Sequence, residues 1–137
     1  MPRAPRPSEL ARKRAKKRAD DASRRLTRLR FPYCVTCGKT GEGAVLQWAH
    51  LLPGSVESTR WDTMNTATQC APCNFHHEDD PSKYTVWFLN RYGADAYEGL
   101  AARHHNSPIA RFSTQDIEDI AKEFERQIAE LEAKEEF

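Results

Sequence analysis

Two pairs of cysteines constrain the fold of this 137-residue chain more than any other feature. The pairs are Cys34 with Cys37 and Cys70 with Cys73, each with two residues between its cysteines. Two such CxxC turns can bring four thiolates into the tetrahedron that a structural zinc ion prefers. A redox CxxC would explain only one pair, and two disulfides conflict with a reducing compartment. The pattern therefore predicts a structural Zn²⁺ whose binding free energy helps a small core to fold.

Composition narrows the class of protein further. No apolar run approaches the roughly 18 residues that a membrane-spanning helix needs. The basic N-terminal segment lacks the apolar stretch of a secretory signal. We therefore expect a soluble, cytoplasmic protein with no membrane partner, of a length that suits one compact domain with flanking helices.

The net charge of +1 is an average over three unlike segments. Residues 1–30 carry a net charge of +9, residues 31–112 carry −2, and residues 113–137 carry −6. Small apolar residues at helical spacing predict a basic helix that begins near Ser8 and ends near Pro32. We expect this 1–30 arm to bind DNA phosphates, although a solvated tail would have the same composition. The candidate DNA-binding residues are Arg12, Lys13, Arg14, Lys16, Lys17, Arg18, Arg24, Arg25 and Arg28.

Three polar residues lie between and just after the cysteine pairs. A strand expected at residues 45–50 ends in His50, and a polar loop leads from it to Asn65. The second cysteine pair runs directly into Asn74, and residues 75–78 are expected to open a short helix. The order of His50, Asn65 and Asn74 resembles that of the HNH (ββα-metal) nuclease superfamily with embedded zinc knuckles.

A closer resemblance rests on several short motifs taken together. They are CxxC at residues 34–37, Trp-Ala-His at 48–50, Thr-Arg-Trp-Asp-x-x-Asn at 59–65, Gln-Cys-x-x-Cys-Asn at 69–74 and Asn-Arg-Tyr-Gly at 90–93. Over about residues 31–134 the chain is similar to the NinG (Rap) recombination nucleases of lambdoid phages. The resemblance implies a metal-dependent endonuclease that cuts branched DNA, including Holliday junctions and D-loops, inside a bacterial host.

The same residues could support phosphodiester hydrolysis. His50 is the candidate general base, because an imidazole is largely neutral near pH 7 and can accept a proton from water. Asn74 is the candidate ligand of a catalytic Mg²⁺ or Mn²⁺, with Glu78 and then His77 as further ligands. Arg60 could hold a phosphate oxygen. The HNH resemblance implies that Asn65 fixes the loop that orients the base.

Each of these residues has a simpler interpretation. Asn74 could cap a short helix, and Glu78 could belong to a solvated acidic turn. Many HNH sites place a metal ligand directly before the base, whereas this chain has Ala49 there. A non-catalytic zinc-containing nucleic-acid-binding module therefore stays open as an alternative. So does a general HNH nicking nuclease without a preference for junctions.

The rest of the chain is expected to be helical. Helices are predicted at residues 82–92 and 94–103, with residues 104–106 as a helix terminus and loop. A last helix at 113–134 carries one apolar stripe, which could pack within the chain or pair with a second subunit in a homodimer. We expect a small α+β protein with a ββα-metal (HNH) core held by a four-cysteine zinc site and flanked by helices. Its expected parts are the arm at 1–30, the nuclease core at 31–92 and a helical region at 93–137.

Overall fold

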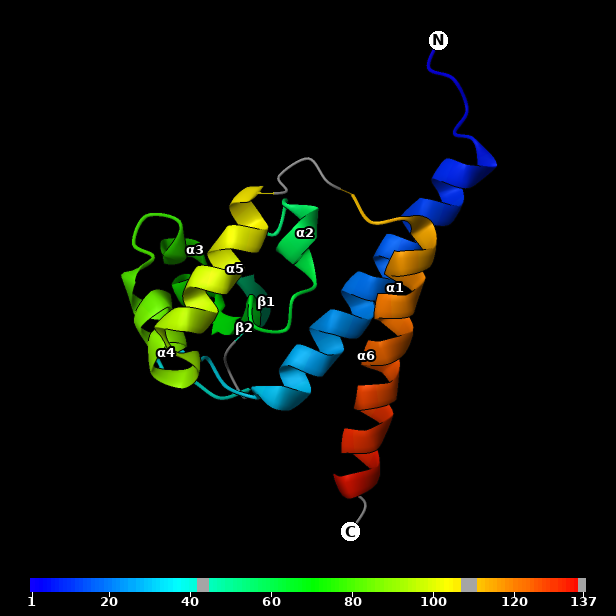
Figure 1. Cartoon of the computed structure of the whole chain (residues 1–137). Coiled ribbons are helices and arrows are strands. Elements are labelled where there is room, and N and C mark those ends of the chain that lie inside the picture. Colours follow the sequence, from blue (N-terminus) through cyan, green and yellow to red (C-terminus); the bar gives the residue numbers. More distant parts are fainter. Residues whose placement is uncertain (42–44, 107–110, 136–137) are drawn as a thin grey trace. The chain divides into compact units, whose positions relative to one another are not determined.

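The structure, a computed structural model, describes residues 1–41, 45–106 and 111–135. Within these ranges it has six helices and one two-stranded sheet (Figure 1), which confirms a small α+β fold. In chain order the elements are α1 (Pro7–Arg30), β1 (Leu46–His50), α2 (Glu57–Arg60), β2 (Thr66–Cys70), α3 (Ala71–His77), α4 (Ser82–Tyr92), α5 (Ala94–Asn106) and α6 (Thr114–Glu135). None of these described helices combines the length and apolar character needed to cross a membrane.

The chain packs as two compact units. One unit consists of Met1–Leu26 together with Arg111–Phe137, and the other consists of Thr27–Ala110. The first unit thus contains most of α1 and all of α6, and the second contains the sheet and the helices α2 to α5. The three-part division expected from the sequence stays a prediction, because packing does not test which parts fold or act independently.

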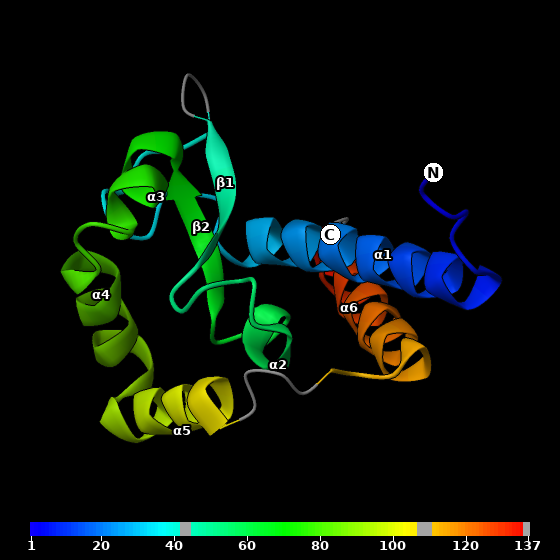
Figure 2. The same cartoon turned by 90° about the horizontal axis from the view of Figure 1, so that it is seen from above.

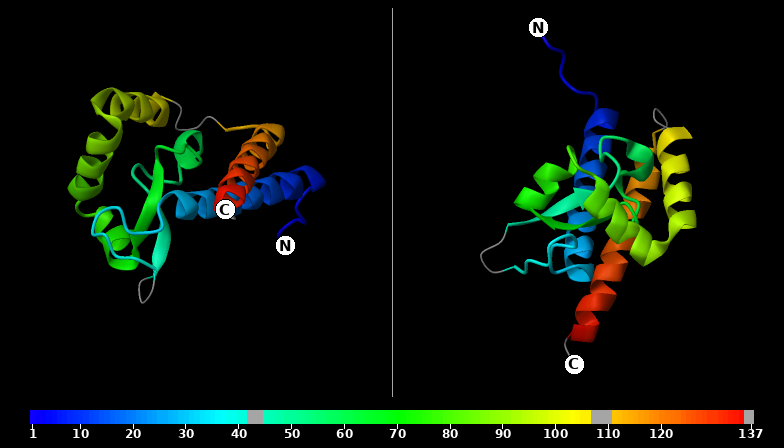
Figure 3. Two further views of the ribbon diagram at one scale, coloured as in Figure 1. Left: turned by 90° about the horizontal axis from the view of Figure 1, so that it is seen from below. Right: turned by 90° about the vertical axis from the view of Figure 1, so that its left-hand side faces the viewer.

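Helices α1 and α6 pair along one apolar seam. Buried residues recur at intervals of four and three in both helices, which is the heptad spacing of a coiled coil. They are Ala15, Ala19, Ala22 and Leu26 in α1, and Ile117, Ala121, Phe124 and Ile128 in α6. Both helices run in the same direction in all views (Figures 1, 2 and 3). The apolar stripe of the last helix is therefore covered within the chain.

The sheet is an antiparallel pair whose register joins Leu46 to Cys70 and His50 to Thr66. Helix α3 follows β2 without a loop and packs against both strands (Figure 2). The expectation that a helix opens at residues 75–78 is wrong, because α3 already begins at Ala71. Pro72 explains the early start, since proline favours the first turn of a helix. Asn74 is consequently a helical residue.

The core of the second unit lies between the sheet and the helices α4 and α5. Its buried residues are Phe31, Ala49, Leu51, Ala67, Tyr84, Phe88 and Leu100. Helix α4 ends as expected at Gly93, whose φ of 91° is a conformation that glycine adopts without strain. Helix α5 continues to Asn106 and is one turn longer than predicted, and it packs against α2 and α4. That extra turn contributes to the candidate site.

Candidate functional site

The four cysteine sulfurs form one cluster, as the sequence predicted. All four Sγ atoms lie within 4.8 Å of one another, and those of Cys37 and Cys70 are 3.7 Å apart. A tetrahedral zinc ion with Zn–S bonds of about 2.3 Å needs sulfur atoms about 3.8 Å apart. The donor set therefore fits a structural zinc ion. In the part of the chain that the structure describes, no other group of three or more His, Cys, Asp or Glu side chains is placed to hold a metal.

The surroundings of the cluster favour one thiolate. Burial raises the pKa of the Cys34 thiol, but hydrogen bonds with the Thr36 side chain and with backbone groups outweigh it and bring the pKa to about 6. The Thr36 side chain lowers the pKa of Cys73, but burial and hydrogen bonds with the other cysteines raise it to about 12. Because zinc binds thiolates, loading the site must release protons, and the affinity for zinc should rise with pH.

His50 lies at the end of β1 in a fixed orientation. Its ring packs edge-on against Trp48, with ring centroids 4.5 Å apart. Its Nε2 is 3.0 Å from the carbonyl oxygen of Arg60. A carbonyl oxygen only accepts, so Nε2 donates this hydrogen bond, and the basic lone pair of the neutral ring lies on Nδ1. The backbone of residue 60 thus selects the tautomer of the candidate base.

The loop after β1 passes very close to this imidazole. A Cβ atom at Gly54 would lie 3.0 Å from the His50 ring, so any side chain there would push the ring or the loop by a few tenths of an ångström. The guanidinium of Arg60 donates a hydrogen bond of 2.8 Å to the carbonyl oxygen of Gly54 and lies over the Trp48 ring at 5.4 Å. Arg60 therefore contacts both the loop and the base, while the phosphate-binding role expected for it stays a prediction.

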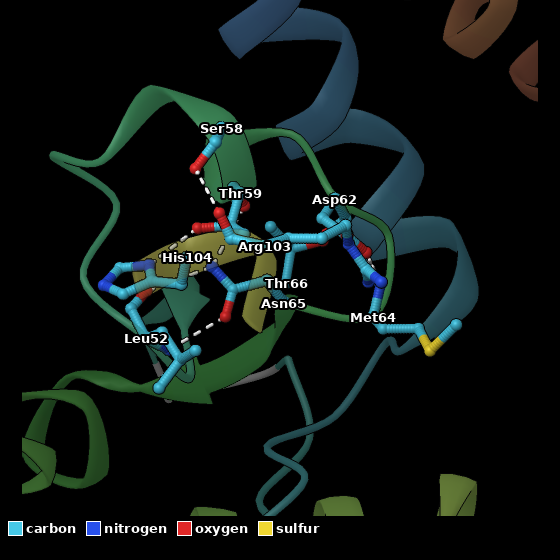
Figure 4. Close-up of polar contacts among 9 residues, drawn as sticks. All are labelled: Leu52, Ser58, Thr59, Asp62, Met64, Asn65, Thr66, Arg103 and His104. Carbon is cyan, nitrogen blue, oxygen red and sulfur yellow. Dashed lines mark hydrogen bonds and ion pairs between the residues drawn. The ribbon is translucent and has the colours of Figure 1, made fainter. Parts of the chain in front are cut away.

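The side chain of Asn65 is fully buried and binds the chain segment between His50 and Arg60. Its Nδ2 donates to the carbonyl oxygens of Leu52 and Thr59, each at 3.0 Å, and its Oδ1 accepts from the Leu52 amide at 2.8 Å (Figure 4). These bonds tie the chain after His50 to the segment before Arg60. This geometry suits the positioning role that the HNH resemblance implies for Asn65.

The last turn of α5 contacts the same segment and was missed by the sequence analysis. The Thr59 hydroxyl is 2.8 Å from Nδ1 of His104, and both residues are buried (Figure 4). Arg103 forms a two-point ion pair with Asp62, at 3.1 and 2.8 Å. Ser58 donates a hydrogen bond of 3.0 Å to the Arg103 carbonyl oxygen. Residues 103 and 104 therefore fix the turn at residues 58–62, whose carbonyl at position 60 holds the base.

The candidate ligands of the catalytic metal do not form a cluster as the four cysteines do. Asn74 donates a 2.9 Å hydrogen bond through Nδ2 to Gln47, a partner that the sequence analysis did not single out. Alternation along β1 puts Gln47 and His50 on opposite faces of the strand. His77 is 2.8 Å through Nε2 from the Leu51 carbonyl oxygen, and its Nδ1 is buried without a hydrogen-bond partner among the described residues. Glu78 is exposed directly after α3.

The nine candidate DNA-binding residues all lie on α1, but they are not equivalent. Arg18 donates from Nε to Glu125 at 2.9 Å, and Arg25 forms an ion pair with Glu132. Both glutamates belong to α6. Two residues expected to contact DNA therefore contact the acidic helix instead in this structure, while Lys13, Arg14 and Arg28 are exposed.

Fold and site together define a small α+β protein with a four-cysteine cluster suited to zinc. A model of the family described as bacteriophage Lambda NinG protein matches residues 6–135. Protein ninG of Escherichia phage 933W is 21% identical over 98 residues, which are 72% of this chain and 47% of that relative. Protein ninG of Salmonella phage P22 is 22% identical over the same length and shares. The chain thus belongs to the NinG family of phage proteins.

These similarities cover only part of each relative. The chain spans about half the length of the curated relatives it matches, since the aligned part is 47% of each. No solved structure matches the chain significantly. The activity, substrates and partners of the relatives therefore do not follow for this chain from similarity alone.

Proposed function

We propose that this NinG-family protein is a metal-dependent DNA endonuclease that cuts branched DNA, such as Holliday junctions and D-loops, during phage recombination. The observation that carries the proposal is the fixed tautomer of His50 at the end of β1. The strands β1 and β2 and the helix α3 follow in the order that the ββα-metal resemblance implies, and α3 carries Asn74. Membership of the NinG family supports a role in phage biology.

In the proposed mechanism, Nδ1 of His50 takes a proton from the attacking water. The water oxygen forms a bond to phosphorus, and the bond from phosphorus to the leaving ester oxygen breaks. The Arg60 carbonyl steadies the imidazolium that results, because Nε2–H already points at it. The Arg60 guanidinium is half-buried over the Trp48 ring and would leave the Gly54 carbonyl to hold a phosphate oxygen.

Oxygen donors near α3 fit a hard divalent ion. Asn74 uses Nδ2 on Gln47, so its Oδ1 is the side-chain atom that suits Mg²⁺ or Mn²⁺, and the exposed Glu78 carboxylate is the second candidate. His77 is the weaker candidate, because its Nε2 is engaged and its Nδ1 is buried. When bound, the ion would supply positive charge to the phosphate in the transition state. Ala49 offers no ligand, so water or DNA would complete the coordination.

The decisive experiment is cleavage of a labelled four-way junction and a matched linear duplex with Mg²⁺ or Mn²⁺. We expect wild type to cut the junction preferentially, and His50→Ala to lose cutting while keeping its fold. His76→Ala is the matched control, since this exposed histidine on α3 has no assigned role. A His50→Ala protein that cuts like wild type would contradict the assignment of the base.

One observation favours a second function. Ala49 lacks a ligand, and Gln47 and His50 lie on opposite faces of β1, as a non-catalytic zinc-containing nucleic-acid-binding module would tolerate. Binding of both DNAs without any cutting by wild type would support this module. Equal cutting of both substrates would instead indicate a general HNH nicking nuclease.

A homodimer would suit symmetrical cleavage of a four-way junction, and we include it in the proposal. The apolar seam of α6 is covered by α1, so the dimer would have to use another surface. Light scattering with and without junction DNA tests this part. A monomer under both conditions would remove it.

A further inference from the structure

We propose that the DNA backbone lies along the face of α1 that points away from α6, and that Arg18 and Arg25 bind α6 and not DNA. The choice of DNA as the partner rests on the proposed function. The division of the basic residues rests on the packing of α1 against α6. From composition alone, all nine basic residues of α1 are equal candidates for DNA binding. The packing of α1 separates those that face α6 from those that can face DNA.

The first observation is the geometry of the ion pairs. Arg18 pairs with Glu125 and Arg25 with Glu132, so both pairs join residues 107 apart in sequence. Each arginine directly precedes a buried residue of the seam, Ala19 or Leu26, and each glutamate lies one or four residues after a buried residue of α6. These are the g and e positions of a parallel coiled coil, where such pairs set partner and orientation.

The second observation is a basic stripe on the opposite side of α1. With about 100° per residue, Lys13, Lys17, Arg24 and Arg28 fall within about 60° of one another around the helix axis. The centre of that stripe is about 180° from the centre of the buried Ala15–Leu26 seam. All four side chains are exposed. The stripe is about 22 Å long, enough to follow a DNA backbone past several phosphates.

The acidic side chains near the stripe and near the α6 side of α1 indicate which of the two surfaces can bind phosphates. Asp21 pairs with Lys17 at 2.8 Å and with Arg24 at 3.1 Å, but its side chain is 52% exposed. Exposed pairs of this kind contribute little to stability, so phosphates can replace Asp21. The groove on the α6 side, with a volume of about 630 Å³, is reached by Lys17 and Asp21 from the edge of the stripe and is lined by Arg14, Arg18 and Arg25 together with the α6 carboxylates Glu125 and Glu132. Those two carboxylates would repel a phosphate backbone there.

Binding to a linear duplex, measured over a range of salt concentrations, tests the proposal without requiring cleavage. Lys13→Gln/Arg28→Gln changes two exposed stripe residues that do not line the groove. It should reduce the magnitude of the slope of log K against log[salt] by about 1.8, since each lost phosphate contact removes about 0.9. The control removes both interhelical pairs at constant net charge: Arg18→Gln/Arg25→Gln/Glu125→Gln/Glu132→Gln. We expect this variant to keep the wild-type slope, with helix content checked by circular dichroism.

Three results would overturn the proposal. The first is an unchanged slope for Lys13→Gln/Arg28→Gln, which replaces two exposed side chains and leaves the seam intact. The second is a slope reduced equally by the fourfold variant. Wild-type protein that binds anionic vesicles but no duplex would overturn it as well. Duplex binding with the predicted slopes but without any cutting would overturn only the proposed nuclease activity, so the two failures are distinguishable.

Discussion

Asn65 makes three side-chain hydrogen bonds while its side chain has no exposed surface. All three partners are backbone atoms of the loop between β1 and β2. An asparagine amide offers both the acceptor and the donors that this arrangement needs, and no other side chain of the same size does so. The loop that presents His50 therefore depends on one buried amide.

We expect Asn65→Asp to destabilise the second unit by several kcal/mol. The carboxylate lacks N–H donors, so the Leu52 and Thr59 carbonyls would lose their partner at about 1–3 kcal/mol each, and a charge would be buried. Urea unfolding measures the loss, and Asn90→Asp on the exposed surface of α4 is the matched control. Equal unfolding midpoints for the two variants would show that the hydrogen bonds of Asn65 carry little stability.

We expect Gly54→Ala to lower the rate of cleavage with little effect on the free energy of unfolding. The Cβ of Gly54→Ala would meet the His50 ring at 3.0 Å, so the ring or the loop must move. A shift of about 1 Å in a catalytic group can cost about 100-fold in rate. The contact at Gly54 needs a shift of only a few tenths of an ångström, so we expect junction cleavage to fall measurably but by less than that factor. Gly41→Ala, with nothing within 4 Å, should stay at the wild-type rate. Equal rates for the two variants would contradict the positioning of the base.

At the scale of elements, α5 fixes the turn at residues 58–62. Thr59→Val removes the hydroxyl that contacts His104 and leaves the shape of the side chain nearly unchanged. We expect a loss of about 1–3 kcal/mol in the free energy of unfolding, because a buried imidazole nitrogen loses its partner. Thr59→Ser keeps the hydroxyl and should recover much of that loss. The idea fails if Ser and Val at this position unfold alike.

The lowered pKa of His104 predicts that the stability of the fold depends on pH. Burial lowers its pKa below the ordinary 6.5, and the charge of His105 lowers it further. The unfolded chain therefore takes up this proton at a higher pH than the folded chain does. The stability that depends on a neutral His104 is complete above pH 6.5 and is lost as the pH falls from there toward the lowered pKa.

A comparison of wild type with His104→Gln isolates this contribution. The difference in their unfolding free energies should narrow between about pH 7 and pH 5, because only wild type loses stability through this imidazole. Chemical denaturation at each pH measures both curves. A difference that stays constant over this range would show that His104 keeps its ordinary pKa in the folded protein.

Local sequence signals predicted much of the fold. The spacing of the cysteines predicted that the four sulfurs come together. The last helix was predicted at residues 113–134, and Ser113 and Asp116 form reciprocal capping bonds at its start. The contacts of Thr59 with His104 were not predictable in this way, because 45 residues separate the partners. Nor was the seam between α1 and α6, since each apolar stripe indicates a buried face without naming what covers it.

For the whole molecule, the cysteine cluster joins two distant parts of the second unit. A zinc ion there would bind the chain before β1 to the end of β2 and the first turn of α3, and its affinity would add to the stability of the folded state. We expect about one zinc per chain by elemental analysis, and a lower melting temperature after treatment with a strong chelator. Cys37→Ser should abolish the effect of the chelator. A melting temperature that the chelator leaves unchanged in wild type would contradict a structural role.

The parallel pairing of α1 with α6 has a consequence for the order of folding. The partners Arg18 and Glu125 are 107 residues apart, so α1 leaves the ribosome about 5–20 s before α6 is available at ordinary rates of translation. Closing so long a loop is slow unless the intervening chain has already become compact. The second unit, with its shorter-range contacts, should therefore fold first. Until α6 has been synthesised, the strongly basic α1 is without its acidic partner.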